Sequence, residues 1–489
     1  MISSIPDFRG RHDAESEYEA DICPDRLYRI TRFRPNGFFR SGQEPPSGGG
    51  PAPGAKAKPP VVSVSGNGLY LRIRGYPEPY DGKLSLLFAM ENKDGTCYLN
   101  QFEKRYDVAP DPKTLWKDLK VGDDAGYPAD NEASVCEILP GGGHMAVAAS
   151  RRGRSHAHSG KPRDDSFFLD SDRDTGWTAA AVADGAGSAR FSRKGSELAC
   201  RTAVGEFLAI MRNGDQDRLE AILGEFKGRA EGVISLRSDR LGPLPAEEGG
   251  AVQDPTSLVL NPVVRAYKAI EEEVERRRAG GRGGPVEIRD YHTTLLFAAL
   301  KRFRFGYCIA SFWIGDGGLA LCNPDGTGEA IVLGSPDAGE FAGQTRFLTM
   351  GEELDDKRGV RERIFFSFPE DFEALILATD GVTDPYFPSE ESILSPEAWK
   401  HFWERILREG DGENPGCREL FSEDADGSLR QKDLLGWLGF WRKGEHDDRT
   451  ILVVKKHPES RVIRGRRGQG PAAGTDGAPP PGTDGPRSG

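Results

Sequence analysis

The sequence predicts an α+β sandwich in which β-sheets lie in the middle and helices cover them. Two observations lead to this fold class. From about residue 145 onward, many short apolar runs have the length and composition of buried strands. Longer segments between them carry apolar residues at helical spacing. Because the strands and helices come in groups rather than in strict alternation, a layered α+β fold is favoured over a parallel α/β fold.

The first half of this region predicts two strands followed by helices. Met145 to Ser150 and Trp177 to Ala183 are apolar runs of strand length. Ser196 to Met211 has apolar residues at helical spacing, and residues 216–235 and 258–278 have a similar pattern. We therefore expect three helices after the second strand.

The second half predicts a series of strands and then more helices. Further strands are expected at residues 293–300, 305–314, 318–322, 329–333, 363–367 and 374–379. A helix should begin near Ser395, with Ser395 as its N-cap, Pro396 at the first helical position and Glu397 in the first turn. A last helix at residues 428–440 should precede a final strand, Thr450 to Val454.

Composition excludes several classes of protein. The chain has 489 residues, enough for two or three domains, and a net charge of -12, which does not favour nucleic-acid binding. No run reaches the roughly 18 apolar residues of a membrane span, and the N-terminus lacks the pattern of a secretion signal. Seven scattered cysteines without a CxxC pair predict reduced thiols in a cytoplasmic protein and make a structural zinc site improbable.

The chain divides into five predicted segments. Residues 1–36 form an N-terminal segment, and residues 37–60, rich in Pro, Gly, Ser and Lys, are expected to be a flexible linker. Residues 61–135 alternate apolar and polar positions and predict a small β-rich module whose role the sequence does not reveal. Residues 145–456 form the main domain, and the Gly- and Pro-rich tail at residues 457–489 should be disordered.

Four segments of the main domain place aspartates at an end of an apolar strand. Asp184 and Asp380 each follow a strand and precede a glycine, as does Asp316. In the fourth segment, Asp447 and Asp448 come just before a strand. Glycine beside an aspartate allows a sharp exit from the strand and a close approach of backbone oxygens to a ligand.

This pattern predicts a site for hard divalent cations. Carboxylates without His or Cys select Mg²⁺ or Mn²⁺, and several converging carboxylates would repel one another without cations. Two ions about 4 Å apart can share a water, lower its pKa and hold a phosphoryl group. A single Asp-Gly after a strand is usually only a turn. Four such segments in order are much harder to explain as turns alone.

These segments resemble, in their usual order, the motifs of the protein phosphatase 2C family, the metal-dependent serine/threonine phosphatases. The resemblance covers residues 145–456 and is closest to the bacterial branch of the family. The motifs that carry it are Ser155-His156 followed by Arg163-Asp164-Asp165-Ser166, then Val182-Ala-Asp184-Gly185-Ala-Gly187, Ile314-Gly-Asp316-Gly, Ala378-Thr-Asp380-Gly381-Val-Thr-Asp384 and Asp447-Asp448-Arg449-Thr450.

The resemblance implies a fold and a set of roles. The fold is a four-layer αββα sandwich of two antiparallel sheets with helices outside. Asp184 would bridge two core Mn²⁺ or Mg²⁺ ions, and the Gly185 carbonyl would bind one of them. Asp380 and Asp447 would hold the other, and Asp165 would sit beside the cluster and bind through water. Some family members hold a weaker third ion at the positions of Asp316 and Asp384.

The sequence departs from the family at the phosphate-binding arginine that many members have just before the first motif. That place falls near Gly160 here. Arg154, His156, His158, Lys161 and Arg163 are candidates to replace it, with His156 and Arg163 taken as catalytic together with Asp165. His156 is also readily explained as a structural histidine, and Lys161 and Arg163 as solvated charges. At the last motif Asp447 fits the metal register, but a shift by one residue would exchange its role with that of Asp448.

The implied activity is hydrolysis of phosphoserine and phosphothreonine in proteins by a bridging metal-bound hydroxide, without a covalent intermediate. The substrate would then be a phosphorylated protein, and a cognate protein kinase would be a signalling partner. No role is expected for nucleic acid or for a membrane. Two alternatives stay open. One is a catalytically weak module that binds phosphoproteins or scaffolds a complex, and the other is a hydrolase of small phosphate esters.

Overall fold

The computed structural model describes most of residues 116–457 together with six N-terminal strands. Backbone and side chains are described for residues 116–121, 127–230, 232–240, 255–281, 284–336, 345–351, 354, 359–412 and 414–457, and the backbone alone for residues 241, 357 and 358 and for the N-terminal strands. The chain divides into two compact units, residues 1–118 and 119–489.

The N-terminal unit contains two antiparallel sheets of three strands each, with the orders β1-β4-β3 and β2-β5-β6. The strands are β1 (Tyr18–Asp21), β2 (Tyr28–Arg40), β3 (Val61–Val64), β4 (Tyr70–Arg74), β5 (Tyr80–Asn92) and β6 (Cys97–Val108). A β-rich module was expected, but not its extent, because β2 enters the residues predicted as a linker. Its register against β5 shifts between Pro35 and Gly37, and such a bulge lets a strand accommodate proline. Residues 41–60 of that predicted linker lie outside the described residues.

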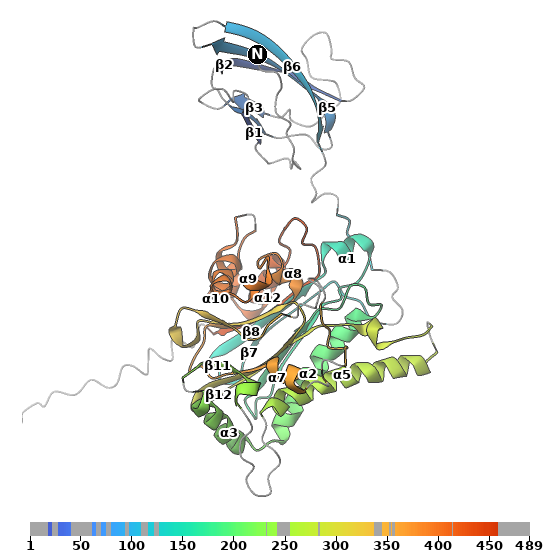
Figure 1. Ribbon diagram of the computed structural model, residues 1–489, viewed down its shortest axis with the longest axis vertical. Coiled ribbons are helices and arrows are strands. Elements are labelled where there is room, and N and C mark those ends of the chain that lie inside the picture. Colours follow the sequence, from blue (N-terminus) through green and yellow to red (C-terminus); the bar gives the residue numbers. More distant parts are fainter. Residues whose placement is uncertain are drawn as a thin grey trace, which may run out of the picture. The chain divides into compact units, whose positions relative to one another are not determined.

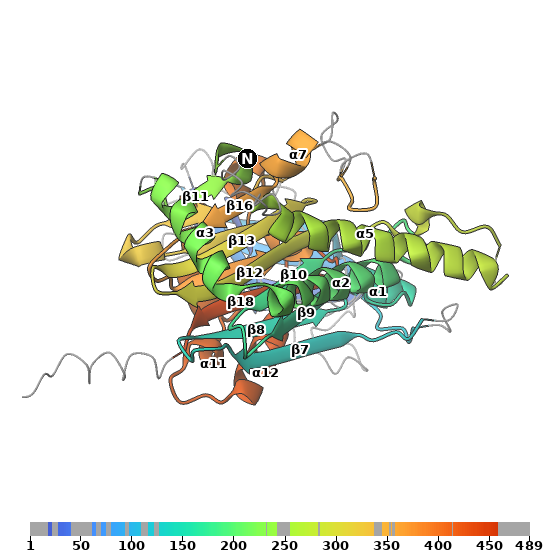
Figure 2. The same cartoon turned by 90° about the horizontal axis from the view of Figure 1, so that it is seen from below.

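The second unit is built on two antiparallel sheets of six strands each (Figures 1 and 2). The first sheet has the order β11 (Ser235–Arg237), β16 (Ile364–Ser367), β13 (Gly306–Ile314), β12 (Leu295–Phe303), β10 (Thr178–Ala183) and β9 (Ser166–Ser171). The second has the order β15 (Ala330–Val332), β14 (Gly318–Cys322), β17 (Ala374–Ala378), β18 (Arg449–Lys456), β8 (His144–Arg151) and β7 (Glu132–Ile138).

Helices cover the outer face of each sheet and complete the αββα sandwich that was predicted. The first sheet is covered by α2 (Ser192–Asn213) and α5 (Thr256–Ala279), and α3 (Gln216–Arg229) follows α2. The second sheet is covered by α10 (Pro396–His401), which continues into the π-helical turn Phe402–Leu407, and by α12 (Gly427–Trp437). Shorter helices are α1 (Arg154–Ser159), α4 (Ser238–Leu241), α7 (Lys357–Glu362), α8 (Asp380–Thr383), α9 (Glu390–Ile393) and α11 (Arg418–Phe421), with 3-10 turns at Ile288–Tyr291 and Pro324–Gly326.

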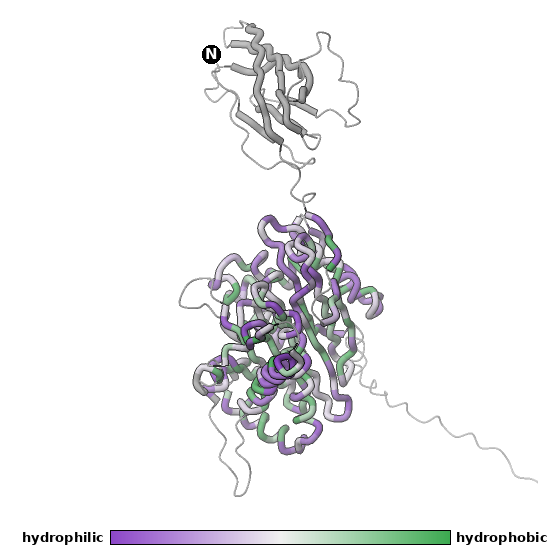
Figure 3. The backbone as a smooth tube through the Cα atoms, turned by 90° about the vertical axis from the view of Figure 1, so that its right-hand side faces the viewer, coloured by the Kyte–Doolittle hydropathy of each residue, from purple (hydrophilic) through white to green (hydrophobic). Residues whose placement is uncertain are grey.

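The continuous apolar runs of the sequence form strands that are covered on both faces. In β10, Ala180 and Val182 face the core between the sheets, whereas Ala179 and Ala181 face the core under α2 and α5. All six residues of this strand are therefore buried. Figure 3 shows hydrophobic backbone running through the interior of this unit, with polar segments at its periphery.

Helix boundaries follow local capping chemistry. The Ser395 side chain accepts a hydrogen bond from the Ala398 backbone N–H at 3.2 Å, and Pro396 occupies the first turn, as predicted. The helix expected at residues 216–235 ends earlier, at Arg229. Gly232 adopts a positive φ of 85°, and the chain then enters the edge strand β11.

The main domain begins earlier than predicted. Glu132–Ile138, partly assigned to the N-terminal module from the sequence, pairs with β8 as the edge strand β7. At the other end, the His457 backbone N–H donates to the Gly143 carbonyl at 3.0 Å, so this first residue of the predicted tail is held against the domain. Residues 458–489 lie outside the described residues. No helix in the described part of the chain is long and apolar enough to cross a membrane.

Candidate active site

Three strand ends bring three carboxylates together. Asp184 follows β10 and Asp316 lies just beyond β13, both in the first sheet, whereas Asp380 lies just beyond β17 in the second sheet. One carboxylate oxygen from each of the three lies within 4.8 Å of the others. The site therefore sits where the two sheets meet, and it presents the oxygen ligands that hard divalent cations prefer.

The Asp184 backbone is fixed by the start of the neighbouring strand. Its N–H donates to the Thr294 hydroxyl at 2.8 Å, and its carbonyl accepts from the Thr294 N–H and the Thr293 hydroxyl, each at 2.9 Å. Gly185 comes next, where an added Cβ would lie only 2.7 Å from the Asp164 carbonyl oxygen. Only glycine fits this approach, which explains the Asp-Gly pair in steric terms.

Asp165 links the two sheets beside this cluster. Its Oδ2 accepts hydrogen bonds from the Thr379 and Thr450 hydroxyls, both at 2.7 Å. Its Oδ1 is buried and receives no hydrogen bond from a donor among the described residues. The Asp165 carboxyl group lies within hydrogen-bond reach of the Asp184 carboxyl group. A buried acceptor without a donor next to a second carboxylate is the arrangement expected where water or a cation completes the site.

The electrostatics of the cluster also fit cations. Burial, and then the charges of Asp380 and Asp165, raise the pKa of Asp184 well above its usual value. Burial, and then Asp316 and Asp447, do the same for the pKa of Asp380. Within the described part of the chain, no Lys or Arg pairs with either carboxylate. Deprotonation of both carboxyl groups without a nearby positive charge costs free energy. The set of oxygen ligands therefore fits a divalent cation such as Mg²⁺ or Mn²⁺.

Asp384 lies one turn after Asp380, at the end of α8. Its backbone N–H donates to the Asp380 carbonyl at 2.8 Å. The side chain is exposed, yet partial desolvation and the charge of Asp316 raise its pKa to about 6. Asp316 and Asp384 are therefore close enough to interact at the edge of the cluster.

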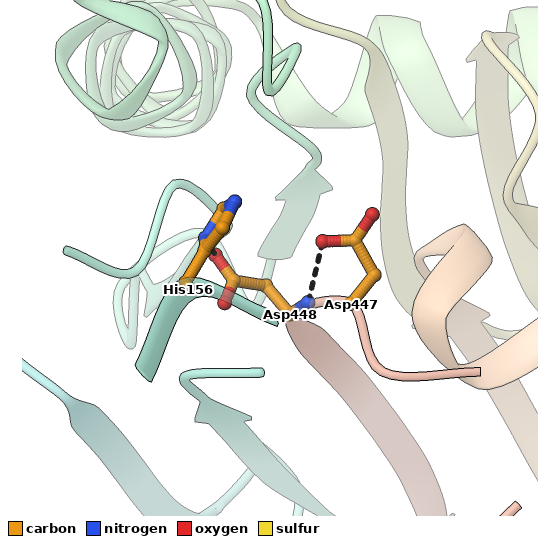
Figure 4. A group of neighbouring side chains, drawn as sticks. All are labelled: His156, Asp447 and Asp448. Carbon is orange, nitrogen blue, oxygen red and sulfur yellow. Dashed lines mark hydrogen bonds and ion pairs between the residues drawn. The ribbon is translucent and has the colours of Figure 1, made fainter. Parts of the chain in front are cut away.

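The two neighbouring aspartates of the last motif have different environments (Figure 4). Asp448 is 1% exposed, and both of its oxygens are engaged. Oδ1 accepts from the Gly153 N–H at 2.6 Å, while Oδ2 accepts from the Asp164 N–H at 2.5 Å and lies 2.9 Å from His156 Nδ1. Asp447 is exposed and extends on the other side of the shared backbone, where its Oδ1 accepts from the Asp448 N–H at 2.8 Å. The geometry favours Asp447 as the ligand and Asp448 as an anchor.

His156 is held in an ion pair rather than pointed at open solvent. It lies on α1, is 8% exposed, and has its Nε2 3.9 Å from Asp164 Oδ2 in addition to the Asp448 contact. Burial lowers its pKa, but the hydrogen bond and charge of Asp448 outweigh burial and raise it to about 9. The imidazolium therefore joins the first motif to the last.

Arg163 also points into the protein. Its Nη1 donates to the Ser150 hydroxyl at 2.5 Å and to the Asp165 carbonyl at 2.9 Å, and its Nε and Nη2 donate to Asp130 Oδ1. The side chain is 7% exposed. These contacts favour a role in positioning the Asp165 backbone over the predicted contact with substrate phosphate.

Among the other basic candidates for phosphate binding, only Lys161 and His158 are exposed. The Arg154 guanidinium donates to the carbonyls of Phe440 and Gly439 at 2.9 and 2.6 Å. The Lys161 ammonium donates to the Gly187 carbonyl at 3.0 Å from an exposed position.

Sequence reasoning did not assign roles to Thr379 and Thr450, which hold Asp165, or to Ser150 and Asp130, which hold Arg163. Thr379 and Thr450 do fall inside the quoted motifs, next to Asp380 and two residues after Asp448. Their position at strand ends was the available signal.

Comparison with known proteins agrees with this geometry. Residues 152–429, more than half of the chain, match a family model described as protein phosphatase 2C. No curated protein matches the chain at the sequence level.

Several solved structures are similar at low identity. The catalytic domain of the serine/threonine phosphatase PstP, in complex with two manganese ions, is 16% identical, and the match covers 66% of this chain and 99% of that one with a TM-score of 0.30. RsbX in complex with magnesium is 13% identical, and the match covers 66% of this chain and 99% of that one with a TM-score of 0.30. The serine/threonine phosphatase Stp1 from Staphylococcus aureus is 12% identical, and the match covers 65% of this chain and 97% of that one with a TM-score of 0.32.

Proposed function

Because this chain belongs to the protein phosphatase 2C family, we propose that it hydrolyses phosphoserine and phosphothreonine of proteins with the help of Mn²⁺ or Mg²⁺. The observation that carries the proposal is the convergence of Asp184, Asp316 and Asp380 within 4.8 Å at the junction of the two sheets. Every carboxylate expected for the family's metal centre is present in the chain, so nothing in the ligand set argues for an inactive protein.

The residues divide into ligands and supports. Asp184 would be shared by two ions, the Gly185 carbonyl would add to one, and Asp380 and Asp447 would hold the other, while Asp316 and Asp384 would hold a third. Bound ions supply an activated water and neutralise the charge of the phosphate. Asp165 would accept a hydrogen bond from that water with its Oδ1, and the two threonine hydroxyls that donate to its Oδ2 fix the direction of the carboxylate.

We propose direct attack of water on phosphorus, so that a phosphorus–oxygen bond to water forms while the bond to the serine or threonine oxygen breaks. The departing oxygen takes up a proton to leave as an alcohol. Four of the five cysteines in the described part of the chain are buried, and burial raises the pKa of the partly exposed Cys136, so none offers a ready thiolate nucleophile. Cys200 is the cysteine nearest in sequence to the second motif, and it is buried with its Sγ directed to the Ser166 carbonyl at 3.6 Å. Burial raises the pKa of this thiol far above neutrality.

His156 and Arg163 are positioning residues in this account. His156 holds Asp164 and Asp448 together, and Arg163 holds the Asp165 backbone against Ser150. Such outer contacts orient metal ligands, and their loss typically lowers metal affinity or activity about 10- to 100-fold.

We further propose a phosphorylated protein of the cytoplasm as substrate, with a cognate protein kinase as the source of the phosphate. The five cysteines in the described part of the chain are all free thiols, as is usual in a reducing compartment.

The proposal is tested by phosphate release from a phosphothreonine peptide. The full chain with Mn²⁺ should release phosphate, a chelator should abolish release, and added Mn²⁺ should restore it. Asp380→Asn, which removes one ligand charge at nearly constant volume, should be inactive although folded by circular dichroism. Activity that survives both the chelator and the substitution would overturn the proposal.

A further inference from the structure

A buried serine stands near the end of the otherwise apolar strand β8, beside the active site. Ser150 follows the buried run Met145–Ala149 and is itself 0% exposed. A buried hydroxyl costs free energy unless it is hydrogen-bonded, so its partners indicate its role. Ser150 is the register partner of Thr450 on the adjacent strand β18, and the two hydroxyl oxygens lie 2.6 Å apart.

The direction of this hydrogen bond follows from its neighbours. A hydroxyl group has one proton to donate. Thr450 donates its proton to Asp165 Oδ2 at 2.7 Å, so the proton between the two hydroxyls must come from Ser150. The Ser150 oxygen in turn accepts from Arg163 Nη1 at 2.5 Å. A continuous relay of hydrogen bonds therefore runs from the guanidinium through two hydroxyls to the carboxylate.

Arg163 thus fixes both the backbone and the carboxylate of Asp165. The Nη1 group that donates to Ser150 also donates to the Asp165 carbonyl at 2.9 Å. The second hydroxyl on Oδ2, that of Thr379, accepts from the Thr450 backbone N–H at 3.0 Å and is oriented by it. Two donors therefore hold Oδ2, and Oδ1 is the oxygen that receives no hydrogen bond from a described residue. The relay sets the direction in which Oδ1 is presented.

The outer end of the relay is Asp130. Its Oδ1 accepts from Arg163 Nε at 3.0 Å and from Nη2 at 2.7 Å. The Asp130 side chain is 56% exposed, whereas that of Arg163 is 8% exposed. Solvent screens the attraction between their charges, so the contact acts chiefly through its geometry. Two hydrogen bonds from one guanidinium fix its plane and hence the direction of Nη1.

Asp130 is held in place by the segment to which it belongs. This entry segment, residues 127–131, leads into the edge strand β7 and is fixed at both ends. The Tyr127 hydroxyl donates to a glutamate of α5 at 2.7 Å. The Asn131 carbonyl accepts from the Arg152 backbone N–H at 2.8 Å. The exposed carboxylate therefore offers the guanidinium a fixed partner.

We propose that Ser150 and Asp130 are positioning residues of the reaction, which act through Arg163 to set the orientation in which Asp165 meets the attacking water. This rests on the proposed phosphatase function and adds two residues to it. The relay ends on Asp165 and not on the carboxylates that would hold the core ions. Loss of the relay should therefore lower kcat and leave KM and Mn²⁺ affinity nearly unchanged.

The first test is Ser150→Ala in the full chain. It removes one hydroxyl from a strand that already carries three alanines, so the fold should be preserved. With saturating Mn²⁺ and a phosphothreonine peptide, kcat should fall about tenfold, while KM and the Mn²⁺ dissociation constant stay within about threefold of wild type. The matched control is Ser311→Ala, because Ser311 is equally buried in β13 and its hydroxyl has no hydrogen-bond partner among the described residues. This control should keep the wild-type kcat.

The second test separates the geometry of Asp130 from its charge. Asp130→Ala should lower kcat about tenfold, whereas Asp130→Asn, which retains the accepting oxygen, should stay within about threefold of wild type. The matched control is Asp239→Ala, because Asp239 also accepts two hydrogen bonds from an arginine, Arg237, which lies in the edge strand β11. An asparagine variant as slow as the alanine variant would contradict the geometric role.

Wild-type kcat in Ser150→Ala or in Asp130→Ala would overturn the proposal. A loss of kcat matched by an equal loss of Mn²⁺ affinity would also overturn it, because the damage would then lie in the metal centre and not in the orientation of Asp165.

Failure of the phosphatase function itself would look different, because the wild type would then hydrolyse no phosphopeptide. The relay can still be tested by urea unfolding of the metal-free Ser150→Ala, Thr450→Val and double variants. If the two hydroxyls act together, the double variant should shift the urea midpoint by less than the sum of the two single shifts. Additive shifts would reject the relay whether or not the wild type is active.

Discussion

Asp447 and Asp448 are adjacent in sequence, yet their substitution is expected to have different effects, on Mn²⁺ affinity for Asp447 and on fold stability for Asp448. Asp447 is exposed at the cluster, whereas Asp448 is buried and accepts from two backbone N–H groups and His156. Asp447→Asn should lower Mn²⁺ affinity at least tenfold and leave the melting temperature of the metal-free protein nearly unchanged. Calorimetric titration with Mn²⁺ and thermal melting in chelator measure the two effects.

Asp448→Ala should instead destabilise the fold by about 3 kcal/mol or more, because it leaves the buried His156 charge without its partner. Urea unfolding of the metal-free protein measures this loss. A stable Asp448→Ala variant that has lost only Mn²⁺ binding would exchange the roles assigned to the two residues.

At this scale the sequence predicted the converging carboxylates better than the residues that hold them. Asp184, Asp316 and Asp380 could be recognised because each lies at the end of an apolar run and precedes a glycine. The pairing of His156 with Asp448 spans 292 residues of sequence and leaves no local pattern. Arg163 was predicted as a phosphate contact for the same reason, since its partners Asp130 and Ser150 become neighbours only in the folded chain.

Between elements, the close approach of α8 to the start of β18 depends on Gly381. An added Cβ at this position would lie 1.7 Å from the Asp448 carbonyl oxygen, so a side chain would push α8 and Asp380 away from the cluster. Gly381→Ala should therefore cost about 3 kcal/mol of unfolding free energy and lower Mn²⁺ affinity.

The matched control for this substitution is Gly205→Ala in the middle of α2, where an added Cβ meets no atom within 4 Å. It should stabilise the protein by up to about 1 kcal/mol, because alanine favours the helix. Urea unfolding of both variants decides the matter. Equal stability of the two alanine variants would contradict the claim that backbone packing fixes Asp380.

The elements that the sequence predicted well are those buried on both faces. Strands such as β13 and β17 are continuous apolar runs, and they formed where expected. The edge strands β7 and β9 were not predicted as strands of the main domain because most of their residues are only partly buried, so their apolar signal is weak. The end of α3 was misplaced because residues 230–235 continue its apolar pattern while Gly232 turns the chain away.

At the scale of the whole molecule, the metal centre should couple stability to pH. Burial and mutual repulsion raise the pKa of Asp184 and Asp380 in the folded protein. The pKa of the buried Asp164 beside them is likewise raised to about 6, by burial first. A raised folded-state pKa favours the protonated carboxyl. The protonated carboxyl groups therefore stabilise the metal-free protein at low pH. This contribution is lost as the pH rises from the carboxyl pKa of the unfolded chain, near 4, through the raised pKa values of the folded protein.

Mn²⁺ binds the deprotonated carboxylates, so it should stabilise the protein more at pH 7.5 than at pH 5.5. At a hundredfold excess over the dissociation constant, one ion contributes about 2.7 kcal/mol. The measurement is the melting temperature with Mn²⁺ minus the melting temperature with chelator, taken at each pH. Protonation changes elsewhere in the chain affect both samples equally at a given pH, so they cancel in this subtraction. If Mn²⁺ raises the melting temperature at pH 7.5 by no more than it does at pH 5.5, the carboxyl groups of the cluster do not have raised pKa values.

The most direct test of the central claim measures ion binding and phosphate release on the same sample. Calorimetric titration of the full chain with Mn²⁺ at pH 7.5 gives the occupancy, and release of phosphate from a phosphothreonine peptide is followed at each free Mn²⁺ concentration. We expect at least two ions per chain and an activity that rises with the occupancy of the second ion. Full occupancy without release of phosphate from any phosphopeptide would contradict the account and would favour a protein that binds phosphoproteins without hydrolysing them.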